Sequence, residues 1–375
     1  MAILPLDGTG VKKYDWNTYM LDTNHPLRAC LTVIVAVLAI GACTTTPESL
    51  DIYFVDVEGG QATLMVTPAG ETLLIDAGYP GQGKSDPTPG DPNVARDARR
   101  IAAAAADANV AKIDYLLVTH FHGDHFGGAM ELAQLIPIGT FIDQGTEASE
   151  ASSSARTLGL IQAYKKVREQ HRYMVPTVGE RLPLQDVEIT IVSSAGNILE
   201  SPIDVAGAAN PACDRPLPVP GTNPENPRST GILLRFGEFR FLDLGDLVGQ
   251  PLSDLVCPSN RIGAVDVYLV SHHGGADAAD PATLAAFRPR VAVLNNGAKK
   301  GGEAPIVDVL RHAEALEDVW QLDLSAQEGA ENFPSAFIAN LDTETEHWLR
   351  ISAYRDGSFR VFNKRTGKWK RYDAD

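Results

Sequence analysis

Apolar residues along the chain gather into short runs that alternate with longer segments of helical spacing. Ten runs have the length and the β-branched or aromatic content of strands, and they are predicted at residues 52–57, 63–67, 72–75, 115–118, 140–142, 189–192, 232–236, 239–242, 267–270 and 291–294. Apolar residues three and four positions apart predict helices at residues 94–106, 129–135, 155–170, 281–286 and 306–316.

Two segments interrupt this pattern. Residues 80–92 and 206–228 are rich in proline and glycine and follow neither period. Long loops of this composition are either functional or tolerated surface insertions, and both interpretations stay open. If they are functional, we expect them to form walls of a substrate cleft.

The composition agrees with a globular enzyme. The 375 residues, of which 44% are hydrophobic, suffice for a large core in one domain or in a domain with insertions. The formal net charge of −16 is retained beyond residue 42, because residues 1–42 hold equal numbers of acidic and basic residues. Such a chain repels a polyanion at long range, which argues against a nuclease without excluding local phosphate chemistry.

A cluster of candidate metal ligands follows the predicted strand at residues 115–118. His120, His122, Asp124 and His125 fall within six residues. They can divide between two metal ions, with His120 and His122 on one and Asp124 and His125 on the other. Imidazole nitrogen with carboxylate oxygen suits zinc best, and manganese and iron also accept these ligands.

This segment resembles the His-x-His-x-Asp-His signature of the metallo-β-lactamase superfamily. The superfamily pattern also needs an earlier Asp, a later bridging Asp and a final His. The chain matches these, each after an apolar run, at Asp76, at Asp246 and at the pair His272 and His273. The resemblance implies an α/β fold, the four-layer αβ/βα sandwich, into which the mixture of strands and helices fits.

A narrower resemblance comes from residues 53–61, 244–246 and 271–274. These motifs are similar to the hydrolase domain of bacterial DNA-uptake competence proteins, over roughly residues 51–294.

The superfamily resemblance also implies roles. Asp246 bridges or shares the metals, and Asp124 holds the second metal and orients the attacking water. One of His272 and His273 closes the second site, and the other donates a hydrogen bond to the substrate or protonates the leaving group. We favour His273 as the ligand and His272 as the substrate-side residue, although spacing alone leaves the choice open. Asp76 is expected to support the ligand loop by hydrogen bonds.

One expected ligand is missing. Many superfamily members carry a further His on a loop before the bridging Asp, but the predicted strand at 189–192 runs into residues 193–197, which contain no His. His171 is the only His between His125 and His272, and it ends a predicted helix, where a solvated His has an ordinary electrostatic explanation. The first metal site is therefore expected to be weak or completed by water, and occupancy by one metal or two stays open.

Positive charge is concentrated in two places. Residues 359–372 interleave cations with aromatic residues, as single-strand binders do. A terminal strand pair with a solvated cationic face, after a hairpin turn at Asp356 and Gly357, explains this more simply. Lys299 and Lys300 follow the strand at 291–294 on a glycine-rich loop, where they would either bind a phosphate near the metals or lie in a plain turn.

The beginning of the chain carries an export signal. Arg28 precedes an apolar run at residues 31–40, which is too short for a comfortable transmembrane helix and leads to Cys43. The pattern resembles the bacterial lipobox. It implies a signal region at residues 1–42 with a true start at Met20, a lipid anchor on Cys43, a linker over 43–50 and a hydrolase domain over 51–375. With no Asp after Cys43, an outer-membrane lipoprotein is expected; an uncleaved helix in a cytosolic enzyme is the alternative.

Two cysteines then remain in the exported part. Cys213 and Cys257 either form a disulfide, as an oxidising compartment allows, or are two separate buried thiols.

Together these features predict a metal-dependent hydrolase, zinc-dependent before manganese or iron, that uses metal-activated water. A phosphodiester or phosphorylated compound is the first expected substrate, and a cyclic amide or ester, such as a β-lactam or lactone, is the alternative. A lipid-anchored module that binds without catalysis is the third interpretation. It is disfavoured because buried carboxylates and imidazoles without a metal are costly. No stable protein partner is indicated.

Overall fold

The structure is a computed structural model that describes residues 49–85, 87–203, 207–214 and 223–374. The chain divides into two units, Met1–Thr44 and Thr45–Asp375, and the described residues all belong to the second. The expected signal region and lipid anchor at Cys43 lie outside the described residues. Within the described part of the chain, no helix is long and apolar enough to cross a membrane.

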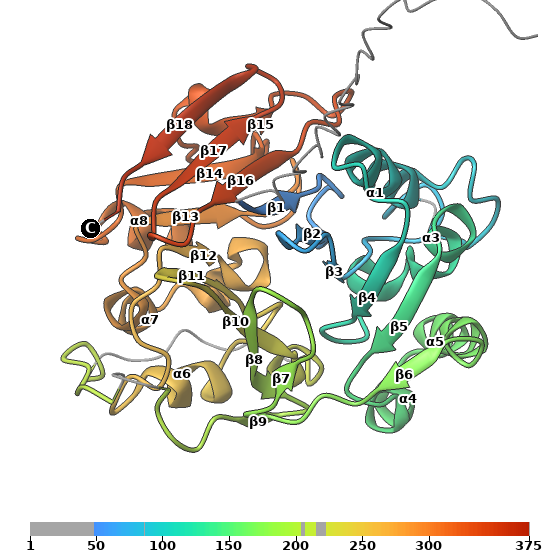
Figure 1. The fold of residues 1–375 in the computed structure, drawn as a ribbon, viewed down its shortest axis with the longest axis horizontal. Helices are drawn as coiled ribbons and strands as arrows, with labels where there is room; N and C mark the ends of the chain where they lie inside the picture. Colours follow the sequence, from blue (N-terminus) through green and yellow to red (C-terminus); the bar gives the residue numbers. More distant parts are fainter. Residues whose placement is uncertain (1–48, 86, 204–206, 215–222, 375) are drawn as a thin grey trace, which may run out of the picture. The chain divides into compact units, whose positions relative to one another are not determined.

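Two mixed sheets form the middle of this unit (Figure 1). The first has the order β18-β17-β16-β1-β2-β3-β4-β5-β6. Its strands are β1 (Leu50–Phe54), β2 (Thr63–Val66), β3 (Thr72–Ile75), β4 (Ile113–Leu117), β5 (Ile138–Ile142), β6 (Arg172–Met174), β16 (Leu349–Ala353), β17 (Phe359–Asn363) and β18 (Lys368–Tyr372).

The second sheet has the order β15-β14-β13-β12-β11-β10-β8-β7, and β9 pairs with β8. Its strands are β7 (Arg181–Leu182), β8 (Glu188–Ser194), β9 (Asn197–Ile198), β10 (Gly231–Phe236), β11 (Phe239–Asp243), β12 (Val267–Leu269), β13 (Val291–Leu294), β14 (Asp318–Asp323) and β15 (Ile338–Asn340).

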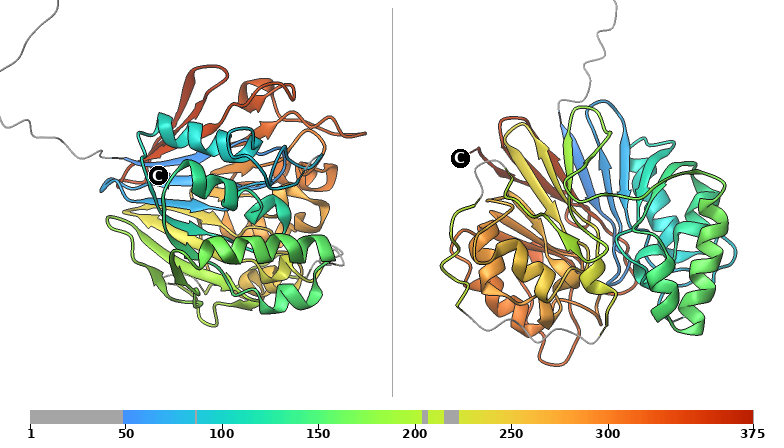
Figure 2. Two further views of the ribbon diagram at one scale, coloured as in Figure 1. Left: turned by 90° about the vertical axis from the view of Figure 1, so that its right-hand side faces the viewer. Right: turned by 90° about the horizontal axis from the view of Figure 1, so that it is seen from below.

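Helices cover the outer face of each sheet (Figure 2). The first sheet shares a core with α1 (Arg96–Asp107), α3 (Ala129–Leu135) and α5 (Ala155–Arg168). The second shares a core with α6 (Gln250–Val256), α7 (Pro281–Phe287) and α8 (Ala304–Arg311). A third core lies between the two sheets. The layers are therefore those of the predicted αβ/βα sandwich. The shorter helices α2 (Gly123–Phe126) and α4 (Glu147–Ser152) lie in loops.

The central strands appear as continuous apolar runs because both of their faces are buried. In β12 and the residue after it, Val267 and Leu269 enter the core between the sheets, whereas Tyr268 and Val270 pack against the helices. Side chains alternate across a strand, so a strand covered on both sides needs apolar residues at every position.

The candidate ligands follow the ends of parallel strands. Parallel pairing joins β3 with β4 in the first sheet and β11 with β12 in the second. Asp76 follows β3, His120 follows β4, Asp246 follows β11 and His272 follows β12. Loops at the carboxyl ends of neighbouring parallel strands leave at the same edge of a sheet, which explains why these side chains can meet.

The C-terminal strands extend the first sheet as an antiparallel pair. A turn in which Tyr354 N–H donates to Ser358 O joins β16 to β17 and contains the predicted Asp356 and Gly357. The edge strand β18 is exposed from Lys368 to Arg371. The interpretation as a terminal strand pair with a solvated cationic face is confirmed, and cations on an edge strand protect it from pairing with another chain.

A disulfide joins Cys213 to Cys257, with their Cα atoms 5.7 Å apart. The first of the two alternatives for these cysteines is therefore the one found. The bond fastens residues 207–214 to the end of α6.

A buried pair of carboxyl groups links β1 to β14. Asp56 follows β1, Asp323 ends β14, and each is 2% exposed. Arg100 Nη1 donates to Asp56 Oδ2 at 2.9 Å, whereas Asp323 Oδ2 has no hydrogen-bond partner among the described residues. Burial and the charge of Asp56 raise the pKa of Asp323 well above its usual range, so we expect this pair to hold a shared proton at neutral pH.

This proton makes stability depend on pH. The unfolded chain releases it near pH ~4, whereas the folded chain keeps it, so the free energy of unfolding falls as the pH rises between those two pKa values. Asp323→Asn provides a neutral partner at every pH and is expected to flatten this decline, which makes the variant more stable than wild type at about pH 9. Urea unfolding at about pH 5 and about pH 9 measures the difference, with the exposed Asp342→Asn as control. Equal slopes for wild type and Asp323→Asn would show that Asp323 carries no such proton.

Candidate metal centre

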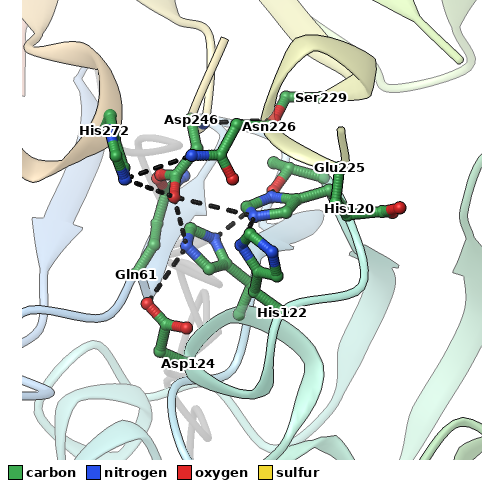
Figure 3. Close-up of polar contacts among 12 residues, drawn as sticks. Gln61, His120, His122, Asp124, Glu225, Asn226, Ser229, Asp246 and His272 are labelled. Atoms are coloured by element: carbon green, nitrogen blue, oxygen red, sulfur yellow. Dashed lines mark hydrogen bonds and ion pairs between the residues drawn. The ribbon is translucent and has the colours of Figure 1, made fainter. Parts of the chain in front are cut away.

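The predicted ligands converge into two buried groups. His120, His125 and Asp246 form one, and Asp124, His125 and His273 form the other; within each group the potential ligand atoms lie within 4.8 Å of one another. His125 belongs to both. The structure keeps Asp124 with His125, as expected, and places His125 next to His120 as well. Figure 3 shows His120, His122 and Asp124 around the Asp246 carboxylate.

The Asp246 carboxylate lies between the two groups. Its Oδ2 is 3.2 Å from His125 Nε2 and 3.6 Å from His120 Nε2. Its Oδ1 is 3.3 Å from His273 Nε2. One carboxylate therefore faces histidines from both sheets, which is the arrangement expected of a bridging ligand.

His122 joins the first group from the side. Its Nδ1 is 2.8 Å from His120 Nε2, and its Nε2 is 2.7 Å from the side-chain amide of Asn223. One ring nitrogen thus faces the centre and the other is held by a neighbouring amide.

Asp76 holds the ligand loop in place. It adopts the left-handed conformation with φ 61°. Its Oδ1 accepts from Thr119 N at 2.8 Å, and its Oδ2 accepts from Thr119 Oγ1 at 2.7 Å. The same Oδ2 lies 2.7 Å from His125 Nδ1, so the His125 proton belongs on Nδ1 and Nε2 is left free for the centre. The expected support of the loop by Asp76 is confirmed.

The adjacent histidines after β12 point in different directions. Both have positive φ, 51° for His272 and 54° for His273, a conformation that non-glycine residues seldom adopt. His273 is buried with Nε2 in the centre, 3.2 Å from His125 Nε2. The His272 side chain is 25% exposed, and its Nδ1 is 2.6 Å from Asp277 Oδ1.

The donor chemistry of the centre suits a divalent cation. Ring nitrogens that can carry lone pairs face each other in two pairs, His120 with His122 and His125 with His273. Asp246 Oδ1 accepts no hydrogen bond from any described residue. Burial alone would raise the pKa of Asp246, but His125 and His273 lower it well below its usual range. Burial lowers the pKa of His120. A charged carboxylate beside a neutral imidazole is the protonation state that metal ligands need.

Lys300 contacts this centre, whereas Lys299 is exposed. The Lys300 ammonium donates to Asp124 Oδ2. Burial would raise the pKa of Asp124, but Lys300 and His125 bring it well below its usual range. The loop that carries Lys300 is tight, because Gly297 N–H donates to Lys300 O at 2.8 Å.

His171 belongs to neither ligand group. It follows α5, and its ring lies against Phe141, with a centroid distance of 5.1 Å.

A segment that the motifs did not identify crosses the site. We call residues 223–230 the strap; they form the described end of the proline-rich loop at 206–228. Glu225 Oε1 accepts from Phe121 N at 3.1 Å and Ser149 Oγ at 2.8 Å. Ser229 Oγ accepts from Asp246 N at 3.2 Å. The only sequence signal for the strap was its loop composition, since amides and hydroxyls have no metal-ligand spacing.

The other long loop, at residues 80–92, is held on α3, where Gly81 N and Gly90 N donate to Glu131 Oε1.

Comparison with known families decides the fold family. Residues 55–172 match the family model described as the metallo-beta-lactamase superfamily. This part of the chain, which carries the ligand loop, is therefore that of a metallo-beta-lactamase superfamily protein. The predicted family and fold class are therefore confirmed, and membership implies that the His and Asp groups bind a divalent metal. The narrower likeness to the hydrolase domain of competence proteins stays a prediction.

The proteins that are similar to this chain match it only in part. A protein of Staphylococcus saprophyticus named a metal-dependent hydrolase is 34% identical over 74 residues, which span 20% of this chain and 24% of that protein. Among solved structures, the diiron β-hydroxylase CmlA of Streptomyces venezuelae is 16% identical, with a TM-score of 0.38, and the match covers 72% of this chain and 52% of CmlA. The metallo-beta-lactamase fold protein YhfI of Bacillus subtilis is 7% identical, with a TM-score of 0.39. The match covers 73% of this chain and 95% of YhfI. At these TM-scores neither structure supports an inference about this chain.

Asp76→Asn is expected to weaken metal binding by about 10–100-fold, because the amide turns an N–H toward donors on Thr119 or His125. Asparagine tolerates positive φ, so the backbone at this position is preserved. Competition with a chromogenic chelator measures the affinity. Thr119→Val, which removes one donor and keeps the carboxylate, is the matched control and should lose less. Wild-type affinity in Asp76→Asn would show that the loop is held by other contacts.

Proposed function

We propose that this chain is a metal-dependent hydrolase with a two-ion centre and that phosphodiesters or phosphorylated compounds are its substrates. The observation that carries the proposal is the place of Asp246, whose two oxygens face histidines of both groups at 3.2 to 3.6 Å. A single carboxylate in this position suits a pair of ions better than one.

The proposed ligands follow from the two groups. His120, His122 and Asp246 hold the first ion, and Asp124, His125, His273 and Asp246 hold the second. Zinc is the first candidate, with manganese or iron as alternatives. When bound, such ions act as Lewis acids and lower the pKa of a coordinated water, which makes it a nucleophile near neutral pH.

Two residues of the chain have proposed catalytic roles. Asp124 is placed by Gln61 N–H, which donates to the Asp124 backbone oxygen at 3.1 Å, and its carboxylate orients the attacking water. His272 lies on the partly exposed side of Asp246, with its Nε2 3.8 Å from Asp246 Oδ2. His272 Nδ1 donates to Asp277 Oδ1, and Nε2, which Asn226 Nδ2 faces at 3.1 Å, is the ring nitrogen that we assign to proton exchange with the leaving group.

A local positive charge favours an anionic substrate. The chain has a net charge of −16, yet Lys300 brings an ammonium group to Asp124 beside the centre. An ion bound by Asp124 would compete with Lys300 for the same oxygen and leave the ammonium to bind a phosphoryl oxygen. A neutral cyclic amide or ester has no negative charge for this ammonium group to bind.

Asp246→Ala is expected to lose metal and activity together, because both ions depend on this carboxylate. Elemental analysis of the purified full-length chain should give about two metal ions in wild type and fewer than one in the variant. Turnover of bis(p-nitrophenyl) phosphate, a chromogenic β-lactam and a lactone is measured on the same samples. The exposed Asp308→Ala is the control.

Different outcomes distinguish the parts of this proposal. Full activity in Asp246→Ala would remove Asp246 from the site. Metal with turnover of only the lactam or lactone would replace the substrate class. Wild-type protein that binds no metal and stays inactive after zinc or manganese is added would contradict the enzymatic function.

We also propose that the chain is an exported lipoprotein anchored by Cys43, on the strength of the sequence pattern at residues 28–43. Cys43→Ser removes the acyl acceptor and should move the protein from the membrane fraction to the soluble fraction of the expressing bacterium. Fractionation with immunoblotting measures this, and Cys30→Ser, within the signal region, is the matched control. Retention of Cys43→Ser in the membrane would contradict the lipid anchor.

A further inference from the structure

The first metal group lacks the third histidine that many superfamily members carry. The end of β8 runs into the sequence Ser193-Ser-Ala-Gly-Asn, and the described part of this region supplies no imidazole. A replacement would have to be a buried donor atom that lies beside Asp246 and has no other partner. The strap passes this place, since Ser229 Oγ binds the Asp246 backbone at 3.2 Å.

Asn226 is a candidate for this atom, because its amide faces His272, whose Nε2 lies 3.8 Å from Asp246 Oδ2. It begins the short 3₁₀ turn Asn226–Arg228 and is 5% exposed. Its Nδ2 is 3.1 Å from His272 Nε2, and its Oδ1 is buried and has no hydrogen-bond partner among the described residues. Figure 3 shows the carboxamide nitrogen turned to His272 and the oxygen turned away from it, on the side of His120. A buried amide oxygen without a partner destabilises the fold, and a cation at this place would offset that cost.

The orientation of the Asn226 amide follows from its neighbour. His272 Nδ1 donates a hydrogen bond to Asp277 Oδ1 at 2.6 Å. With Nδ1 as the donor, Nε2 is the acceptor, and among the described residues the Asn226 amide nitrogen is the donor that faces it, at 3.1 Å. The oxygen must consequently face the other way.

Most other side-chain oxygens of the strap already have partners, and Glu225 belongs to neither ligand group. Glu225 Oε1 accepts three hydrogen bonds, from Phe121 N, Gln144 Nε2 and Ser149 Oγ. Asn223 lies on His122 Nε2, the ring nitrogen that points away from His120. Asn226 Oδ1, by contrast, has no hydrogen-bond partner among the described residues and is therefore available to bind a metal ion.

We propose that Asn226 Oδ1 is the protein ligand that completes the first metal site, together with His120, His122 and Asp246. The inference rests on the proposed metal centre and names its missing ligand. An amide oxygen is a harder donor than imidazole nitrogen, and carbonyl and carboxylate oxygens suit manganese better than thiolate or imidazole sites do. Replacement of the superfamily histidine by Asn226 should therefore shift the first site toward manganese relative to zinc.

The test is metal titration of the full-length chain after chelator treatment, with Mn²⁺ or Zn²⁺ as the probe. Calorimetry gives affinity and stoichiometry, and the electron paramagnetic resonance signal of bound Mn²⁺ reports its surroundings. We expect Asn226→Ala to weaken the binding of one ion by about 10–100-fold and to leave the other within about twofold. Asn226→His should move the affinity ratio of that site toward zinc by about tenfold.

Two further variants separate a ligand from a positioning residue. Asn226→Asp keeps an oxygen at the ligand position but removes the N–H that holds His272, so it should retain Mn²⁺ binding if Asn226 is a ligand. Asn197→Ala removes an exposed amide outside the strap and outside the proposed ligand set, and should keep Mn²⁺ affinity within about threefold. Circular dichroism confirms that each variant is folded.

The outcomes are distinct from those of the proposed function. Wild type without bound metal would overturn the metal centre and this inference together. Wild type with bound ions and a folded Asn226→Ala of unchanged affinity would overturn only the role of Asn226. If Asn226→Asp bound Mn²⁺ as poorly as Asn226→Ala, Asn226 would be a positioning residue for His272, and the ligand assignment would be wrong.

Discussion

The site depends on contact between two sheets, because neither sheet alone supplies a complete ligand set. The His120 loop and Asp76 come from the first sheet, and Asp246, His272 and His273 come from the second. The core between the sheets fixes the distance across which Asp246 meets His125. Phe54 of β1 packs on Phe241 of β11 in that core, with ring centroids 5.9 Å apart. Close-packed interiors transmit small displacements, so a change in this core would be felt at the Asp246 carboxylate.

The same junction gathers buried acidic groups. Asp76 and Asp243 are, like Asp246, almost wholly buried. Burial raises the pKa of Asp243 to about 7, and Gln61 Nε2 donates to both of its oxygens at 3.0 and 3.1 Å. Asp76 is satisfied by Thr119 and His125. Each of these carboxylates has partners within the protein, whereas Asp246 Oδ1 has no hydrogen-bond donor among the described residues. The distribution of donors thus separates supporting carboxylates from the one that faces a cation.

Regular apolar patterns predicted the central strands and failed where buried polar residues interrupt them. The strand at residues 72–75 and that at 291–294 were predicted with the bounds that the structure has, because every position is apolar or small. In contrast, β14 was not predicted, since Gln321 and Asp323 break its apolar alternation. Both are buried in the fold. Gln321 hydrogen-bonds to Asn332 and Phe333, and the charge of Asp56 raises the pKa of Asp323. Such polar contacts join residues that are distant in sequence, so no local period can reveal them. The predicted helix at 306–316 instead begins at Ala304, with Pro305 in its first turn, and ends at Arg311.

The ligand loops were predictable for a related reason, and the strap was not. Histidine and aspartate at short, fixed spacing after an apolar run form a pattern that few other functions need. The strap carries Asn223, Glu225 and Asn226 among prolines. These side chains contact residues that are distant in sequence, at His122, Phe121 and His272 respectively. The disulfide between Cys213 and Cys257 joins the described residues 207–214 to the end of α6 and closes a ring of chain that contains both the strap and Asp246. A loop constrained in this way loses less conformational freedom when it positions a ligand, and a neutral amide on it can serve where a more flexible loop would need the stronger donor.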